Sequence, residues 1–242
     1  MKCVFLCDFI REISQGKETI EMRKGRKKWL ALLLSLVMML ALTPGTSLAT
    51  DDSEGEDNVV ATIGENEYTS LAEAIREAKE GETVVLQQDV EVETSIAVAA
   101  SITLNLNGNT ITNLVEDERL FSVTASGFTV DGTTAGSGMT IPESNTGSFG
   151  FIKIAAKSMV TLNGGTYSGN TDGGAFVKVF HNDELDASGS TVIFNNAEMT
   201  SNNRFFSTDT LTTDVETPTL QVTGGTFTTD GQAFGMDVLY RS

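Results

Sequence analysis

The chain of 242 residues has two cysteines, one histidine, one tryptophan and three prolines, and these scarcities exclude several kinds of chemistry. Both cysteines, Cys3 and Cys7, precede the point where we expect the chain to be cleaved on export. The remainder therefore has no thiol for a disulfide or for covalent catalysis. His181 is the only histidine in the chain. The chain after the cleavage point therefore also lacks the ligands of a transition-metal site, and we expect no metal and no cofactor.

Basic residues are scarce as well. The whole chain has 16 Lys and Arg against 33 Asp and Glu. Residues 1–49 hold 8 of the basic and 4 of the acidic residues, which leaves 8 basic and 29 acidic residues, a net charge of −21, in residues 50–242. Such a surface repels nucleic acid and anionic lipid, so we expect neither as a partner. It also disfavours polyanionic sugars unless metal ions bridge the charges.

Long apolar runs are few, and the clearest one lies near the N-terminus. Residues 23–28 are basic, residues 29–42 are apolar, and residues 47–49 (Ser-Leu-Ala) suit a cleavage site. This order is typical of a secretory signal peptide, and the apolar run is shorter than the roughly 20 residues of a membrane anchor. We therefore expect a leader over residues 1–49, cleavage after Ala49, and a secreted or cell-surface chain with no membrane segment.

The residues before Met22 do not suit a signal peptide, because they include four acidic side chains. We interpret Met22 as the true start of the protein. N-terminal sequencing of the unprocessed precursor tests this interpretation, and a precursor that begins at Met1 would contradict it.

One short pattern is abundant in the rest of the chain. Five segments have two apolar residues separated by one residue, then a polar residue, then Gly or Asn: 104–108, 128–132, 160–164, 192–196 and 220–224. The alternation is typical of a strand with one buried face, and Gly or Asn tolerates the left-handed backbone of a tight turn. Each segment therefore predicts one strand that ends in one corner. Three residues after each segment comes another nonpolar or aromatic residue: Ile111, Ala135, Tyr167, Met199 and Phe227.

The spacing of these segments favours a solenoid. Their second apolar residues are 24, 32, 32 and 28 residues apart: Leu106, Val130, Leu162, Phe194 and Val222. A β-sandwich would turn about every 8 to 12 residues. We predict an all-β chain that forms a right-handed parallel β-helix, with these apolar residues inside it. The polar residues that follow them are then predicted to form one column at a corner: Asn107, Asp131, Asn163, Asn195 and Thr223.

Residues 59–81 are predicted to cap the first coil. Residues 59–63 suit a short strand and residues 64–67 a turn. Ser70 and Glu73 form a capping-box pattern for an α-helix from Leu71 to about Glu80, which Gly81 would end. The apolar face of that helix would cover the open end of the solenoid.

The remaining boundaries follow from composition. Residues 50–58 are acidic and polar and are predicted to be a disordered linker. Residues 82–242 are predicted to be the β-helix. The sequence stops directly after a strand-like run, so we interpret it as truncated at its C-terminus, with an open last coil through which it would assemble with another chain.

Several of these segments resemble one group of proteins. Residues 68–75, 81–86 and 102–108 resemble the N-terminal region of pectate-lyase-like, right-handed β-helix surface proteins secreted by Gram-positive gut bacteria. Residues 164–167 (Gly-Gly-Thr-Tyr) and 224–227 (Gly-Gly-Thr-Phe) are similar to the Gly-Gly-Thr-Phe repeats of those proteins. The resemblance covers residues 59–242. It implies an adhesin-like surface protein, since many members of the group are of that kind.

The enzymes with this fold are polysaccharide lyases and polygalacturonase-like hydrolases, and their motifs are incomplete here. Residues 170–172 (Asn-Thr-Asp) match one hydrolase motif, but Gly-His-Gly and Arg-x-Lys are absent. No Arg or Lys is followed at coil spacing by the paired Asp cluster that a lyase would use. His181 lies beside acidic residues, and we interpret it, with residues 183–186, as part of a solvated loop. We therefore assign no catalytic residue.

Two neighbouring strand-like runs favour glycan binding. If Ile152 and Val177 face inward, alternation places an aromatic and a basic side chain outward on each run. Exposed aromatics at coil spacing would form a platform for sugar rings, whereas the opposite register or a covering loop would remove it. The residues of this candidate site are Phe151, Lys153, Phe176 and Lys178.

Together these observations predict a non-catalytic structural stalk or adhesin-like module whose partners are host or cell-wall glycans. The alternative is a polysaccharide lyase or glycoside hydrolase that acts on plant or host glycans. A third hypothesis is an assembly subunit that another chain completes at the open C-terminal coil. The fold does not decide between them, because one fold supports many functions.

Overall fold

The computed structural model describes residues 58–182, 184–209 and 216–237. The predicted leader, the proposed start at Met22, residues 238–242 and all of the predicted acidic linker except Asn58 lie outside the described residues. The described residues form 20 strands and one helix.

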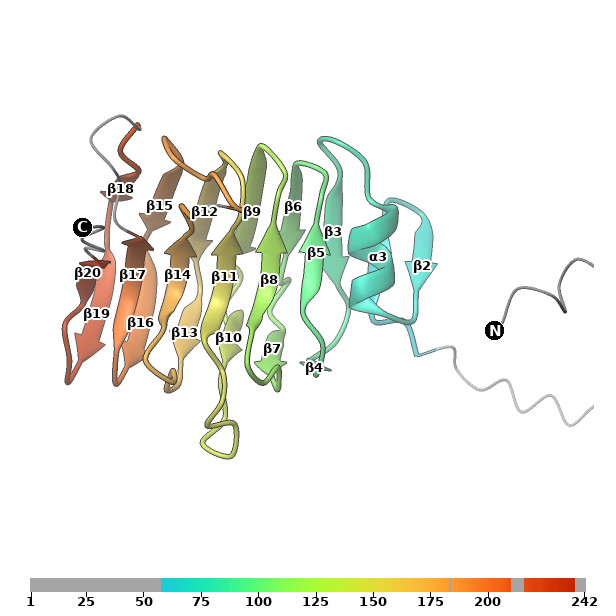
Figure 1. Cartoon of the computed structure of the whole chain (residues 1–242). Coiled ribbons are helices and arrows are strands. Elements are labelled where there is room, and N and C mark those ends of the chain that lie inside the picture. Colours follow the sequence, from blue (N-terminus) through green and yellow to red (C-terminus); the bar gives the residue numbers. More distant parts are fainter. Residues whose placement is uncertain (1–57, 183, 210–215, 238–242) are drawn as a thin grey trace, which may run out of the picture. The chain divides into compact units, whose positions relative to one another are not determined.

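The strands form three sheets (Figure 1). Sheet A contains β1 (Ala61–Ile63), β2 (Asn66–Tyr68), β3 (Thr83–Leu86), β6 (Ile102–Asn105), β9 (Gly127–Gly132), β12 (Met159–Gly164), β15 (Thr191–Asn195) and β18 (Thr219–Val222). Sheet B contains β4 (Val90–Val92), β7 (Thr110–Asn113), β10 (Gly138–Thr140), β13 (Thr166–Ser168), β16 (Ala197–Ser201) and β19 (Gly225–Thr229). Sheet C contains β5 (Ile96–Val98), β8 (Arg119–Val123), β11 (Gly150–Ile154), β14 (Ala175–Val179), β17 (Arg204–Asp209) and β20 (Phe234–Asp237).

Each turn of the chain adds one strand to each sheet. The first rung is β3, β4 and β5, and the sixth is β18, β19 and β20. Every strand of an inner rung pairs in parallel with the corresponding strands of the rungs before and after it, as β9 does with β6 and β12. In Figure 1 sheet C runs upward in front and sheet A downward behind while the chain advances from right to left, which is a right-handed winding. The predicted right-handed parallel β-helix is confirmed.

The N-terminal end of sheet A is closed by antiparallel strands. β1 pairs antiparallel with β3, and β2 pairs antiparallel with β1. The sequence predicted the first of these strands but placed only a turn where β2 begins. The two strands form a hairpin around Gly64, whose φ of 59° suits a tight turn.

Helix α3 (Leu71–Glu77) follows this hairpin and confirms the predicted cap. It begins at Ser70, whose hydroxyl accepts a hydrogen bond from the Glu73 amide at 3.5 Å. The helix ends earlier than predicted, because Ala78 already has an extended backbone with ψ of 137°. Its buried residues Leu71, Ala74 and Ile75 belong to the same core as the strands, so the helix seals the first rung. Seven residues are too few to cross a membrane.

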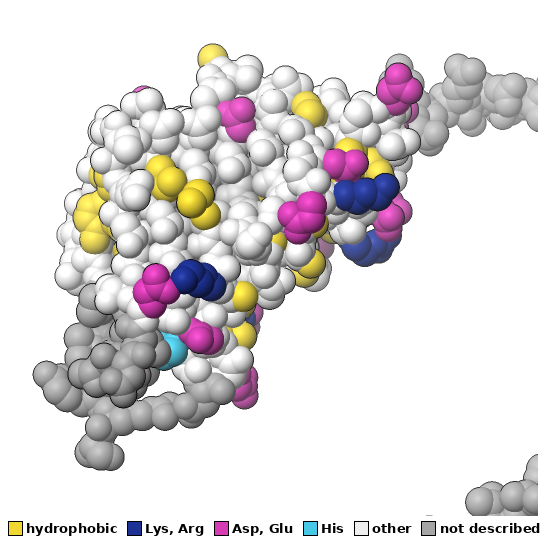
Figure 2. All heavy atoms as spheres, turned by 90° about the horizontal axis from the view of Figure 1, so that it is seen from above, with side chains coloured by type: hydrophobic (Ala, Val, Ile, Leu, Met, Phe, Trp, Pro, Cys, Tyr) yellow, Lys and Arg dark blue, Asp and Glu magenta, His cyan; other side chains and the backbone are white. Residues whose placement is uncertain are grey.

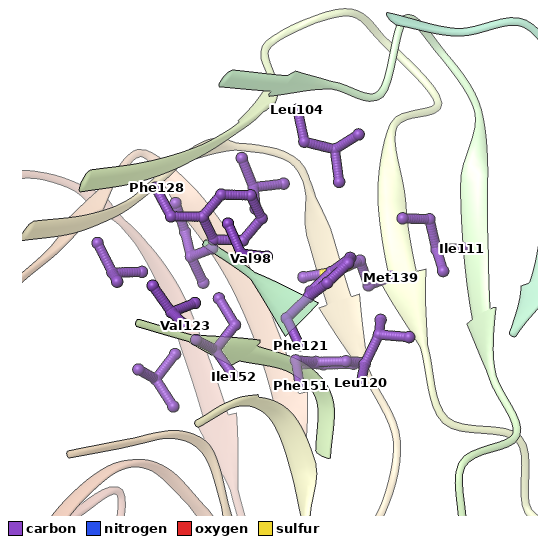
Figure 3. Packing of buried hydrophobic residues seen from close by; sticks show 14 of the residues in the cluster. Val98, Leu104, Ile111, Leu120, Phe121, Val123, Phe128, Met139, Phe151 and Ile152 are labelled. Atoms are coloured by element: carbon purple, nitrogen blue, oxygen red, sulfur yellow. The ribbon is translucent and has the colours of Figure 1, made fainter. Parts of the chain in front are cut away.

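Apolar side chains fill the space between the sheets (Figure 3), and within each sheet they stack from rung to rung. The column from sheet A is Leu104, Val130, Leu162 and Phe194, paired in register from rung to rung. The column from sheet B is Ile111, Met139, Tyr167, Met199 and Phe227. All of these except Phe227 are at most 1% exposed, and burying each large side chain stabilises the fold by about 1.5–3 kcal/mol.

Two predicted members of the sheet A column, Leu106 and Val222, differ from the prediction. Leu104, not Leu106, pairs with Val130, although Leu106 is also buried. In sheet B, Met139 rather than Ala135 pairs with Ile111, because residues 133–137 form a loop before β10. Val222 has the predicted register but is 46% exposed, since no other described rung lies beyond it.

Polar side chains form the predicted column at the corner after sheet A. The amide of Asn163 donates to Asp131 at 3.4 Å, the amide of Asn195 donates to Asn163 at 2.7 Å, and the hydroxyl of Thr223 donates to Asn195 at 2.8 Å. We call these four residues the polar ladder. The fifth predicted member is wrong: Asn105 pairs with Asp131, whereas Asn107 is in the left-handed region (φ 51°) and donates to the Leu86 carbonyl.

Candidate functional site

The two aromatic residues of the predicted glycan platform lie inside the solenoid. Phe151 and Phe176 are both 0% exposed, with ring centroids 4.7 Å apart. Figure 3 shows Phe151 beside Leu120 among the buried residues. The Phe151 ring also lies 6.3 Å from that of Tyr167, which projects inward from sheet B. The prediction that these rings face solvent is therefore wrong, and they cannot form an exposed platform.

The alternation fails at the start of β8, β11 and β14, where consecutive residues are buried. In the pairing of β8 with β11, Gly150 matches Arg119 and Ile152 matches Phe121, but Phe151 has no paired position. Gly150 has φ of 125°, which an L side chain rarely adopts. Two consecutive apolar residues, Phe151 and Ile152, are therefore buried, and strict alternation starts only after them.

The two lysines of the predicted site do lie on the outer face of sheet C. Lys153 and Lys178 are paired in register on β11 and β14, and their side chains are 23% and 18% exposed. The Lys153 ammonium lies 3.3 Å from a carboxylate oxygen of Glu118, and the Lys178 ammonium lies 2.8 Å from one of Asp209. The structure thus brings these lysines together with acidic partners that sequence reasoning did not identify.

The two lysines and an arginine surround one aromatic ring. The Lys178 and Lys153 ammonium nitrogens lie 4.9 and 5.3 Å from the centroid of Phe180, and the guanidinium carbon of Arg119 lies 5.2 Å from it. The same guanidinium carbon is 5.9 Å from the centroid of Phe149. The face of an aromatic ring attracts cations at these distances. We call the following residues the cation–aromatic cluster: Glu118, Arg119, Phe149, Lys153, Lys178, Phe180 and Asp209.

This gathering of basic residues stands out in so acidic a chain. Residues 58–237 contain only seven Lys and Arg, and three of them belong to the cluster. On the face shown in Figure 2, by contrast, acidic and basic side chains are scattered among uncharged polar groups. The cluster therefore brings three of these basic residues together with two carboxylates and two aromatic rings.

Arg119 is nearly buried, and the described residues supply it with no ion-pair partner. It is 4% exposed, and its Nε is buried without a hydrogen-bond partner. No carboxylate of the described residues lies within the 4.0 Å of an ion pair with its guanidinium. Burial lowers the pKa of Arg119 to about 10, while the charges of Glu118 and Asp209 oppose this shift. The side chain is thus still a cation at neutral pH.

A buried polar network holds the loop that covers one side of Arg119. The Asn145 amide donates to the Asn113 and Val115 carbonyls, each at 3.0 Å. The Asn113 amide donates in turn to Ser148 Oγ, also at 3.0 Å. The backbone amide of the next residue, Phe149, donates to the Glu118 carbonyl at 3.1 Å. These bonds place the Phe149 ring against the guanidinium.

The other residues singled out from the sequence lie in turns. The Nδ1 of His181 lies 3.1 Å from Asp186, and hydrogen bonds from Ser188, then from His181, hold the pKa of Asp186 below its usual value. Thr171, the middle residue of the Asn-Thr-Asp match, donates its hydroxyl to the Gly174 carbonyl at 3.3 Å. The backbone amide of His181 donates to Asp209 at 3.4 Å, which ties this loop to the edge of the cluster.

Sequence reasoning missed Arg119, Phe149, Phe180 and Asp209, and one available signal points to Phe180. It stands two residues after Lys178, so the alternation that places Lys178 outward places Phe180 outward as well. Phe149 and Asp209 carry no such signal, since they belong to a long loop and to the end of another strand.

Comparison of the chain with protein-family models, with curated proteins and with solved structures finds no match. The likeness to pectate-lyase-like surface proteins thus rests on the sequence motifs alone. What the structure itself shows is the architecture, a parallel β-helix with an N-terminal cap.

Proposed function

We propose that this chain is a secreted or cell-surface, non-catalytic β-helix that acts as a structural stalk or adhesin-like module and binds glycans weakly through the cation–aromatic cluster. The observation that carries the proposal is that cluster, set on the outer face of a solenoid whose strands are paired from the first rung to the sixth.

The pairing supports the role of a stalk. In a solenoid each rung satisfies the strand edges of its neighbours, so stiffness and stability grow with the number of rungs. Here the backbone pairing is supplemented by the polar ladder and by continuous apolar columns. A body built in this way holds its outer side chains at fixed spacings, which suits the presentation of a binding surface at a distance from its attachment point.

The composition of the cluster supports weak glycan binding. Phe149 and Phe180 are half-buried, so part of each ring remains available to the C–H faces of a sugar. The Lys153 and Lys178 ammonium groups next to Phe180 donate hydrogen bonds of the kind that sugar hydroxyls accept. A site with few aromatic groups and long, flexible lysines favours modest rather than tight affinity.

The experiment is a titration of residues 50–242 with a panel of plant and host polysaccharides, followed by calorimetry. We expect saturable binding of at least one glycan, and we expect Phe180→Ala to weaken it at least tenfold. Phe234→Ala is the matched control, because Phe234 is 38% exposed but lies on β20 outside the cluster. No binding to any glycan, or equal loss in both variants, would refute the binding role. New reducing ends or unsaturated products, with or without calcium, would refute the non-catalytic role.

The last described rung favours assembly as a second function. Val222 and Phe234 are 46% and 38% exposed there, although the equivalent residues Phe194 and Phe206 in the rung before are 0% and 7% exposed. Another chain that paired with this rung would bury them. Sedimentation of residues 50–242 over a range of concentrations tests this function: growth in mass with concentration is expected, and a constant monomer would contradict it.

A further inference from the structure

The last described rung leaves part of the apolar core uncovered. Val222 is 46% exposed and Phe234 38% exposed, while Leu220 and Phe227 are only partly buried. The ring centroids of Phe227 and Phe234 lie 5.9 Å apart, and they lie 5.5 and 6.2 Å from that of Phe205 in the rung before. The core therefore ends in a packed aromatic surface that solvent reaches. We call Leu220, Val222, Phe227 and Phe234 the open end.

The same rung presents three unpaired strand edges. β18, β19 and β20 are each the terminal strand of their sheet. Such an edge pairs readily with another chain unless charged side chains, prolines or bulges protect it. These three strands contain no proline and no basic residue, and Asp237 is their only charged residue. The edges are therefore free of the features that normally prevent pairing.

The charge of the chain favours a second copy as the partner of this surface. Residues 50–242 have a net charge of −21, so most faces of two copies repel each other. The open end is the exception, because its four side chains carry no charge. In a two-fold contact the same surface lies on both sides, and an apolar aromatic surface can complement itself. A basic partner, by contrast, would find only Asp237 to bind on these strands.

The other end of the solenoid does not offer such a surface (Figure 1). There α3 covers the core, and β1 and β2 close sheet A as an antiparallel hairpin. β2 has only three residues and includes Glu67, and exposed Arg76 of α3 lies 3.2 Å from Glu77. A copy stacked head to tail would place its open end on this charged cap. Contact between two open ends buries the apolar surface of both copies and leaves no further end for growth.

We propose that two copies of the chain join through their open ends as a two-fold dimer. This inference rests on the proposed assembly function and names the partner and the contact surface. The two-fold axis turns one copy over, so the facing strands run in opposite directions and pair as antiparallel ladders. β19, the middle strand of the rung with five residues, then pairs with itself about Phe227. β18 pairs with β20 of the second copy, and each has four residues.

Sedimentation of residues 50–242 over a range of concentrations tests the dimer. We expect the mass to double and then to stay constant. Val222→Lys places a charge in the contact and is expected to weaken the dimer at least tenfold. Met159→Lys is the matched control, because Met159 is 53% exposed in the same sheet but lies two rungs before the end. Since both copies are acidic, added salt is expected to strengthen the dimer.

Disulfide cross-linking tests the pairing of the strands. Residues 50–242 contain no cysteine, so introduced cysteines react only with each other. Pairing about Phe227 places Thr226 opposite Thr228 of the second copy, within the range of a disulfide. Thr226→Cys combined with Thr228→Cys is expected to give cross-linked dimers on mild oxidation. Glu198→Cys combined with Thr200→Cys is the control, since these residues have the same positions one rung earlier and are expected to give none.

The outcomes separate this inference from the function on which it rests. A constant monomer would refute the assembly function and the dimer together. Growth beyond two copies would overturn the dimer and leave assembly standing, as would a dimer that Val222→Lys leaves intact or that salt weakens. Cross-linked dimers from neither cysteine pair, or from both pairs equally, would overturn the pairing of β19 with itself.

Discussion

The side-chain amide of Asn195 donates a hydrogen bond to the side-chain oxygen of Asn163, 2.7 Å away on the rung before. The two residues are 32 positions apart in the sequence, yet they are direct neighbours along the axis of the solenoid. Each asparagine side chain has an NH2 group that donates and a carbonyl oxygen that accepts, so a row of asparagines can continue the hydrogen bonding from rung to rung. The polar ladder therefore ties the register of sheet A to specific side chains as well as to the backbone.

Replacing the middle of this ladder should weaken the fold. Asn163→Ala removes the acceptor of Asn195 and the donor to Asp131, and we expect a loss of about 1–2 kcal/mol in the free energy of unfolding, measured with urea. Asn170→Ala is the control, since Asn170 is exposed and outside the ladder, and should change stability by less than about 0.5 kcal/mol. Equal effects of the two substitutions would show that the ladder adds nothing to stability.

The hydroxyl of Tyr167 should be dispensable. Tyr167 is 0% exposed and its hydroxyl is buried without a hydrogen-bond partner in the structure. Tyr167→Phe removes this desolvated group and keeps the ring, so we expect stability to stay constant or to rise by about 1 kcal/mol. A loss of more than 1 kcal/mol in urea unfolding would indicate that the hydroxyl has a partner, such as a buried water.

The same residue predicts a dependence on alkaline pH. Burial, and secondarily the charge of Asp131, raises the pKa of Tyr167 above its ordinary value of 10.0. The neutral phenol therefore contributes stability that is fully present below about pH 10 and is lost as the pH rises further, because the unfolded chain ionises first. Unfolding between pH 9 and 11 should show a steeper loss for the parent chain than for Tyr167→Phe. Parallel curves would contradict the shift.

Gly150 should tolerate no side chain. It has φ of 125°, and a Cβ placed on it would lie 2.1 Å from the carbonyl oxygen of Ala175 on the next rung. We expect Gly150→Ala to lower stability by about 1–3 kcal/mol or more, through strain and overlap together. Gly173→Ala is the control, because Gly173 also has positive φ, 65°, but has no atom within 4 Å of the added carbon. The difference between the two variants isolates the close approach of the rungs.

The loop beside Arg119 should depend on Asn145. Asn145→Ala leaves the buried carbonyls of Asn113 and Val115 without their side-chain donor, and we expect a loss of about 1–3 kcal/mol. Since the same network positions Phe149, glycan binding should weaken too. Asn170→Ala changes an exposed residue outside this network and outside the cluster, and should leave binding unchanged. Full binding by the Asn145 variant would show that Phe149 is positioned by other contacts.

The repeating part of the fold could be predicted because every rung buries one face of its strands, so the same alternation of apolar and polar residues recurs. The alternation around Val130, Leu162 and Phe194 is compatible with only one strand register, and the strands have that register. Around Leu104 and Leu106 the pattern fits two registers, since both are apolar and each is followed by Asn. The structure chooses the earlier pair, and no signal within the segment distinguishes it.

The candidate site could be predicted only in part. Lys153 and Lys178 follow from alternation, whereas the pairs Phe151-Ile152 and Phe176-Val177 offer two apolar residues for one inward position. Both residues of each pair are buried, and neither Phe151 nor Phe176 has a paired position in the ladders of sheet C. The remaining members of the cluster, apart from Phe180, lie in connections or at strand ends that follow no sequence repeat, so the sequence pattern does not indicate that they come together.

The connections between strands differ widely in length while the rungs keep their register. Nine residues join β10 to β11, whereas one residue joins β15 to β16. Because the ladder and the apolar columns hold the strands in register, a graft in the long connection that keeps Asn145 and its hydrogen bonds should change what the surface recognises and spare the scaffold beneath it. New specificity could thus arise in such a molecule by exchanging one crossover at a time.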